Sequence, residues 1–363
     1  MKLALKELFY SKKKYLLIEA VIVLLMFMVL FLSGLAEGLG LAVRSGIQTI
    51  PAEYFLVSDT AENLITVSNL ESAVLEQAEA LTDGKAAPLD IQRMYLEKEN
   101  SDEKLDITYF AIPAGSFLEP EVFEGSGFSE STAGNQIILD DNFQADGISV
   151  GDIVKDSSTD MEFEVAGFAK DQMYGHTSVG FITTESYTKL RQELNPNYEP
   201  TYHAIVIQGG APDNIQIEGT EVVYKADIIE NLPGYTAEQS TIQMIIWVLV
   251  IASAAILGVF YYIITLQKEK QFGVMKAIGL GMGKISAVVC SQVCFVACAG
   301  ACAANLLTFG MAAVLPQTMP FYLNGMFACI VTVSFILISL ASSLLSVGRI
   351  AHIDPIKSIG GAE

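Results

Sequence analysis

The sequence predicts an α-helical polytopic membrane protein with four transmembrane helices and an α+β extracytoplasmic domain inserted between the first and second of them. Hydrophobic residues make up 52% of the 363 residues and charged residues only 17%, whereas a soluble chain carries about 25% charge. The formal net charge is nevertheless −20, so the apolar residues and the acids must lie in different parts of the chain. Because nucleic acid attracts basic proteins, we exclude it as a partner.

Four apolar segments are each long enough to cross a bilayer, because about twenty helical residues span the roughly 30 Å of its hydrocarbon core. They are residues 15–34, 242–266, 285–314 and 322–347. The first also resembles a secretory signal peptide, with lysines at 12–14 before it and a small-x-small pattern at 34–36. Its apolar run exceeds the usual length of about 7–15 residues, and we expect it to be retained as an anchor.

Basic residues predict the orientation, because short segments rich in lysine and arginine stay on the cytoplasmic side. Such residues recur in 1–14, 267–284 and 348–363, whereas 35–241 holds ten basic and 36 acidic side chains. We therefore expect a plasma-membrane protein with both termini and the loop at 267–284 in the cytoplasm. The hairpin at 315–321 and the large domain at 35–241 are expected outside.

Residues 35–241 are numerous enough to form a core of their own, in one or two lobes. Alternating or β-branched runs predict strands at 55–57, 107–112, 137–139, 163–165 and 204–207. Longer patterns predict helices at 64–81 and 184–194. The segment has no cysteine, so no disulfide can stabilise it, and we interpret Asp140-Asp141 as a solvated turn.

Four cysteines recur at every fourth residue of the third apolar segment, which places them along one helical stripe. One interpretation is a metal or redox ladder. The other, which we favour because thiolates are costly in lipid, is packing of small side chains between helices. The residues are Cys290, Cys294, Cys298 and Cys302.

No pattern indicates a catalytic site. Gly283-Lys284 resembles the end of a phosphate-binding loop, but Ile278 and Ile285 stand where that motif requires Gly and Ser or Thr. The three histidines are dispersed and lack zinc-ligand spacing. We predict a chain that is not an enzyme and holds no metal.

The cytoplasmic loop carries a short amphipathic pattern. Phe272 and Met275, with Ile278 or Gly279, fall on one face of a helix, and lysines mark the wetter surface. Such a helix could lie on lipid headgroups or dock in a groove of a cytoplasmic partner, and the periodicity favours neither.

The order of one span, a large external domain and three further spans resembles the MacB/FtsX-type permeases of ABC transporters. The sequence QFGVMKAIG at 271–279 is similar to theirs, as are GDI at 151–153 and FEVAGF at 163–168. The resemblance implies a permease homodimer with two copies of an ABC ATPase subunit, which binds the ATP, and no intrinsic cofactor. It also implies that the ATPase contacts Lys268, Phe272, Gly273, Met275, Lys276, Ile278 and Gly279.

A two-state mechanism follows from that resemblance. Nucleotide-driven closure of the ATPases would draw the loops together, and continuous helices would carry the movement outward. We expect the first span to continue as a helix through 35–48, and the second to begin as a helix at 235–240, before the membrane.

A narrower resemblance is to the haem-efflux, HrtB-like branch of the same permeases. It rests on KLALKE at 2–7, FLSGLAEGL at 31–39, AEYF at 52–55 and YGHTSV at 174–179. It implies export of an amphiphile, with haem as the substrate. The implied substrate-binding residues are Glu37, Arg44, Tyr54, Tyr174, His176 and Tyr235.

One residue departs from this branch, because Gln48 stands where the branch has an acid. Other functions therefore stay open. One is efflux of antimicrobial peptides or antibiotics. Another is an FtsX-like or sensor permease that moves no cargo and activates an extracytoplasmic enzyme or a histidine kinase.

Overall fold

The computed structural model describes residues 12–98, 103–128, 135–209, 215–316 and 319–350. They form two compact units. The helical unit comprises the described residues of 1–38 and 240–363, and the sheet unit those of 39–239. The segments 1–14 and 348–363, which we expect in the cytoplasm, lie largely outside the described residues.

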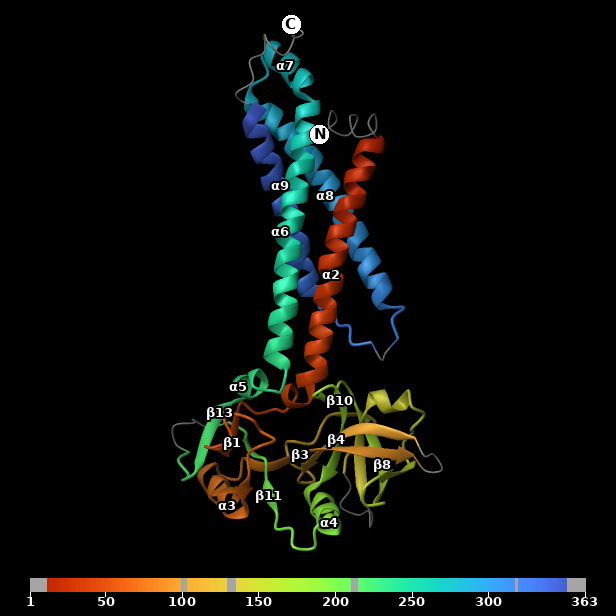
Figure 1. Ribbon diagram of the computed structural model, residues 1–363, viewed down its shortest axis with the longest axis vertical. Helices are drawn as coiled ribbons and strands as arrows, with labels where there is room; N and C mark the ends of the chain where they lie inside the picture. Colours follow the sequence, from red (N-terminus) through yellow and green to blue (C-terminus); the bar gives the residue numbers. More distant parts are fainter. Residues whose placement is uncertain (1–11, 99–102, 129–134, 210–214, 317–318, 351–363) are drawn as a thin grey trace. The chain divides into compact units, whose positions relative to one another are not determined.

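The helical unit consists of long apolar helices and one short polar helix (Figure 1). Among the described residues, four helices are long and apolar enough to cross a membrane, which confirms the predicted fold class. α2 ends at Gln48 and α6 begins at Tyr235, so both helices extend beyond the apolar segments as predicted. The helices are α2 (Lys12–Gln48), α6 (Tyr235–Gln267), α7 (Glu269–Ala277), α8 (Met282–Ala312) and α9 (Gly325–Ile350).

The interior of this unit is built on one stripe of α2. Ile22, Met26 and Leu30 recur every fourth residue and are almost completely buried, as expected for the inner face of a packed helix. α8 contributes small residues to the same core, including Ala301 and Ala304. The cysteine prediction needs correction, because Cys298 and Cys302 are exposed. Alanine and glycine, rather than cysteine, occupy the packed stripe.

Two glycines of α2 hold the segment that precedes α9. The backbone N–H of Tyr322 donates a hydrogen bond to the Gly34 carbonyl at 2.9 Å. A Cβ atom on Gly38 would fall inside van der Waals contact of the Pro320 carbonyl group, and one on Gly34 would overlap the Phe321 ring. Only glycine permits this approach. We call this contact the glycine seat.

The sheet unit contains an eleven-stranded sheet among its described residues, and a separate pair formed by β2 and β11. The predicted α+β class and all five predicted strands are confirmed. The strands are β1 (Tyr54–Ser58), β2 (Leu70–Glu71), β3 (Ala86–Lys98), β4 (Lys104–Ile112), β5 (Val122–Gly125), β6 (Gln136–Asp140), β7 (Ile153–Asp156), β8 (Glu162–Ala169), β9 (Met173–Tyr174), β10 (Thr177–Thr183), β11 (Thr201–Tyr202), β12 (Ala204–Ile207) and β13 (Thr220–Tyr224).

Part of this sheet closes on itself. The pairings run β3–β4–β10–β6–β8–β7 and return to β3, which makes a small closed barrel. Successive side chains along its strands point to opposite faces of the sheet. On β4, Ile107, Tyr109 and Ala111 enter one core, whereas Phe110 and Ile112 enter another. The order β13–β1–β12–β3 continues the sheet outside the barrel, so the unit has two lobes that share β3.

Three helices and one 3₁₀ turn accompany the sheet (Figure 1): α3 (Ser72–Leu81), α4 (Thr184–Leu194), α5 (Lys225–Glu230) and η1 (Asp141–Gln144). The helix prediction at 184–194 is confirmed. The prediction at 64–81 is wrong in its first half, because the helix begins only at Ser72. Glu62 and Asn63 have positive φ, which is typical of turns.

Asp140 is a buried acid with several hydrogen-bond partners, which corrects the interpretation of Asp140-Asp141 as a solvated turn. Its carboxylate is fully buried. It accepts hydrogen bonds from Ser178 Oγ at 2.8 Å, from Asn142 Nδ2 at 2.7 Å and from the Gln172 backbone N–H at 2.6 Å. Burial raises the pKa of the Asp140 carboxyl to about 6, although the bonds from Ser178 and Gln172 lower it.

Candidate functional site

A tight hairpin brings a histidine to the outer ends of two long helices. Gly175 and His176 join β9 to β10 and both have positive φ, at 55° and 64°, as a two-residue type I′ turn requires. Their backbone N–H groups donate to the carbonyls of Val43 and Ala42 on α2, at 3.1 and 2.9 Å. The tip of the hairpin therefore rests on the C-terminal part of α2.

The His176 side chain reaches the first turn of α6. Its Nε2 lies 3.3 Å from Glu238 Oε2, and both side chains are partly open to solvent. A carboxylate at this position also lies near the positive end of the α6 dipole. The hairpin thus connects the two helices that extend beyond the apolar segments.

Arg44 and Tyr235 form the second contact between the same helices. The guanidinium carbon lies 5.7 Å from the centroid of the Tyr235 ring, which is within cation–π range. Arg44 Nε also donates to Gln48 Oε1 at 2.7 Å. We call Arg44, Gln48, His176, Tyr235 and Glu238 the stalk cluster.

The sequence-predicted residues lie in four different places. Arg44, His176 and Tyr235 belong to the stalk cluster. Tyr174 is buried with its ring 5.5 Å from that of Phe110, and burial raises its phenol pKa. Tyr54 stands on β1 with its ring 5.2 Å from that of Tyr224. Glu37 is half-buried on α2 in the helical unit.

Sequence reasoning missed Glu238. Its partner His176 is 62 residues away in the chain, so no local pattern links the two. One signal was available, because Glu238 lies three residues after Tyr235 and therefore on the same side of α6.

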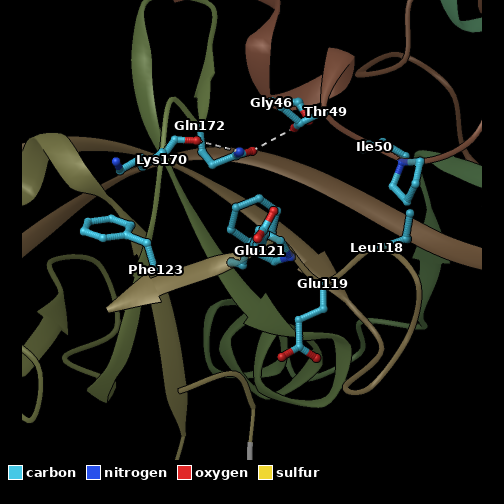
Figure 2. A pocket seen from close by; sticks show the side chains of 12 residues that line it. Gly46, Thr49, Ile50, Leu118, Glu119, Glu121, Phe123, Lys170 and Gln172 are labelled. Atoms are coloured by element: carbon cyan, nitrogen blue, oxygen red, sulfur yellow. Dashed lines mark hydrogen bonds between the residues drawn. The ribbon is translucent and has the colours of Figure 1, made fainter. Parts of the chain in front are cut away.

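The sheet unit also contains a cavity of about 650 Å³ beside the end of α2 (Figure 2). Thr49 donates to Gln172 Oε1 at 3.0 Å, and Gln172 Nε2 donates to the Lys170 carbonyl at 2.8 Å. The Lys170 ammonium lies 5.1 Å from the Phe123 ring centroid. The Glu119 carboxylate points away from the cavity and accepts backbone N–H groups, so its role is structural.

The predicted loop helix is present as α7, but its buried face is not the predicted one of Phe272, Met275 and Ile278 or Gly279. Phe272 and Gly273 are buried, and Met275 and Lys276 are half-buried. Ile278 is 72% exposed, so it does not share a buried face with Phe272. The exposed residues instead follow each other at helical spacing. They are Gln271, Val274, Ala277 and Ile278, which we call the outer face of α7.

Gly279 ends this helix in the left-handed conformation, with φ of 89°. Its N–H donates to the Lys276 carbonyl at 3.1 Å, and the Leu280 N–H donates to the Met275 carbonyl at 3.0 Å. These two bonds define a Schellman motif, which favours glycine at this position. At the other end of α7, the half-buried Lys268 points to Tyr15 and Gln292.

Comparison with known proteins agrees with this architecture. Residues 243–355 match the family described as FtsX-like permease C-terminal. The chain is 28% identical over 363 residues, and all of both chains, to a protein of Staphylococcus haemolyticus named as a hemin transport system permease, HrtB. It is 24% identical over 365 residues, and 99% of both chains, to an uncharacterised ABC transporter permease of Mycobacterium tuberculosis.

Among solved structures, the chain is similar to the periplasmic region of MacB from Actinobacillus actinomycetemcomitans. The identity is 13% and the TM-score 0.37, over 52% of this chain and 97% of that one. The sequence matches agree with the predicted type, an ABC transporter permease of the FtsX/MacB kind, and the four apolar helices agree with a multi-pass membrane protein. Its full-length relatives include permeases of the HrtB kind.

Proposed function

We propose that this permease exports haem, or a closely similar amphiphile, and is energised by a separate ABC ATPase. The observation that supports it best is the stalk cluster, in a chain whose full-length relatives are named as hemin transport permeases. The family type implies an ATPase partner. The permease acts as a homodimer with two ATPase copies, and the sheet unit and the 315–321 hairpin lie outside the cell.

The stalk cluster offers the chemistry that haem requires. The Arg44 guanidinium can bind a propionate, since guanidinium groups pair with carboxylates through two parallel hydrogen bonds. The Tyr235 ring offers a flat apolar face. The His176 imidazole is an iron ligand once its nitrogen is free of Glu238.

Energy enters at the outer face of α7. Val274 and Ile278 are 50% and 72% exposed, which is typical of an apolar patch that another protein covers. ATP-driven closure of the ATPase dimer moves α7, and the movement follows α2 and α6 to the stalk cluster. Cytoplasmic termini are consistent with this arrangement, because α7 must face the ATPase.

Haemin titration of the purified permease tests the substrate. The Soret band shifts on binding, and Arg44→Ala combined with His176→Ala weakens binding about tenfold, equivalent to the loss of one charged hydrogen bond. Tyr95→Ala, which removes an exposed tyrosine of β3, serves as a control outside the predicted site and binds as the parent does. Absence of a Soret shift with the parent protein would reject haem as the substrate.

Thiol labelling of intact cells tests the orientation. In a chain whose five cysteines are replaced by alanine, Asn197→Cys reacts with a membrane-impermeant maleimide and Lys270→Cys reacts only after permeabilisation. The reverse pattern would overturn the assigned sidedness.

A further inference from the structure

Lys268 occupies the single residue at which α6 ends and α7 begins. Its backbone N–H donates to the carbonyls of Ile264 and Thr265 in the last turn of α6, each at 3.2 Å. Its carbonyl accepts the N–H of Phe272 at 3.0 Å. The residue closes one helix and opens the next, so the direction of α7 is determined at this point.

The Lys268 side chain turns inward and connects two further helices. Its Nζ lies 2.6 Å from the Tyr15 hydroxyl on α2 and 3.0 Å from Gln292 Oε1 on α8. The same ammonium lies 5.4 Å from the Tyr15 ring centroid, a cation–π contact. Gln292 is only 4% exposed. One charge therefore connects the beginning of α7 to the beginning of α2 and to the third turn of α8.

A lysine at the end of a membrane helix normally extends into water, because removing its charge from water is costly. Inward orientation requires hydrogen-bonding partners that replace the water. Here Tyr15 and Gln292 supply two, and a small cavity of about 20 Å³ adjoins them. The cavity is also lined by Tyr261 and Ser343, whose buried hydroxyls have no partner among the described side chains.

That cavity is large enough for one water molecule, which needs roughly 10–15 Å³. A water there can bond the hydroxyls of Tyr261 and Ser343 and keep the ammonium partly hydrated. Apolar packing supports the same joint, because Phe272 on α7 is 5% exposed within the core of the helical unit. The joint thus combines a fixed charge with a buried aromatic ring.

We propose that Lys268 is a positioning residue that does not touch the ATPase itself. It fixes α7 on α2 and α8, so that movement of the outer face of α7 is passed to α2 instead of being lost by rotation of α7 alone. The energetic part of this inference rests on the proposed function. The structural part, that Lys268 anchors α7, depends only on the contacts of Lys268 and not on the proposed function.

The first test needs only the full-length permease in nanodiscs. Hydrogen exchange of the backbone amides at 269–277 is compared for the parent, Lys268→Met, Lys268→Arg and the exposed control Lys270→Met. Lys268→Met increases exchange in α7 about tenfold, whereas Lys268→Arg and Lys270→Met stay near the parent. Parent-like exchange in Lys268→Met would overturn the anchoring.

The second test uses the permease with its ATPase. Lys268→Met lowers permease-dependent stimulation of ATP hydrolysis about tenfold with unchanged KM for ATP, and Lys268→Arg restores it. Gln292→Leu gives the same phenotype, and the double variant is no worse than either single one. Increased exchange in α7 with full stimulation would overturn the positioning role. If no ATPase activity is stimulated by the parent, the proposed function fails, while the exchange result still decides the anchoring.

Discussion

Lys268 in the helical unit and Asp140 in the sheet unit show two uses of a buried ionisable group. Asp140 is fully buried and accepts bonds from Ser178, Asn142 and Gln172, all within one sheet domain. Lys268 is half-buried and binds side chains of two other helices. The bonds of Asp140 therefore stabilise the fold of one domain, whereas those of Lys268 determine how separate helices are placed relative to one another.

The difference lies in what each partner is attached to. Asp140 caps η1 and receives the Gln172 backbone, so its loss leaves donors buried in a rigid sheet. The partners of Lys268 lie on helices that can shift as rigid bodies. We therefore expect Asp140 variants to lose stability and Lys268 variants to lose coupling.

The largest effect is expected for Asp140→Ala. It leaves the Ser178 hydroxyl and the Gln172 N–H without their buried acceptor, at a cost of about 3–5 kcal/mol. Thermal unfolding of the full chain in detergent, followed by circular dichroism, measures the loss. Asp146→Ala, at an exposed position, changes stability by less than about 0.5 kcal/mol. Equal midpoints for the two variants would contradict the role of Asp140.

The pH dependence of the sheet unit is the next largest effect. The pKa of the Asp140 carboxyl is about 6 in the folded chain and 3.8 for a solvent-exposed carboxyl, as in the unfolded chain. Between these two values the folded chain therefore holds a proton that the unfolded chain has lost. The contribution of Asp140 to the free energy of unfolding is therefore fully present below pH 4. It declines as the pH rises to 6, by about 3 kcal/mol in total.

The control for this dependence is Asp140→Asn, which cannot ionise. Unfolding midpoints of the parent and the variant are compared from pH 4 to pH 7, and their difference isolates the contribution of Asp140. We expect the parent to lose stability relative to Asp140→Asn as the pH rises. A gain in its relative stability would contradict the prediction.

The glycine seat supplies a third anchor that uses no charge. Gly38→Ala forces a Cβ against the Pro320 carbonyl group, and we expect a loss of about 2 kcal/mol through overpacking. Gly310→Ala is the matched control, because its Cβ meets nothing within 4 Å and alanine favours a helix. The seat is refuted if both variants unfold at the same temperature.

The smallest effect concerns the far end of α7. Gly279→Ala places a Cβ at φ of 89° and costs about 1 kcal/mol. Because Lys268 still anchors the beginning of α7, we expect faster hydrogen exchange only in its last turn. Gly281→Ala, which has negative φ and open space around it, leaves exchange unchanged. Loss of protection along all of α7 would show that Lys268 is not an independent anchor.

The sequence was most informative where one physical rule dominates. Membrane length predicted the four apolar helices, and the mechanism implied by the resemblance predicted that two of them continue to Gln48 and from Tyr235. It failed at β3, whose strand character is interrupted by Pro88, Asp90 and Arg93. Those residues are accommodated because β3 joins both lobes, which no local pattern reveals.

The site was predictable only in part, for a similar reason. Resemblance indicated Arg44, His176 and Tyr235, but Glu238 requires knowledge of the hairpin that carries His176. Likewise, the spacing of Phe272, Met275 and Ile278 gave a helix but the wrong inner face. The inward side of α7 is determined by Lys268 and Phe272 together, and their partners lie in α2 and α8.

ATP hydrolysis by the permease and its ATPase in nanodiscs, with and without haemin, tests the central claim most directly. Haemin stimulates hydrolysis with the parent permease, and Val274→Glu on the outer face of α7 abolishes the stimulation while Soret binding persists. Haemin that binds without altering hydrolysis, or stimulation that survives Val274→Glu, would contradict coupling through α7.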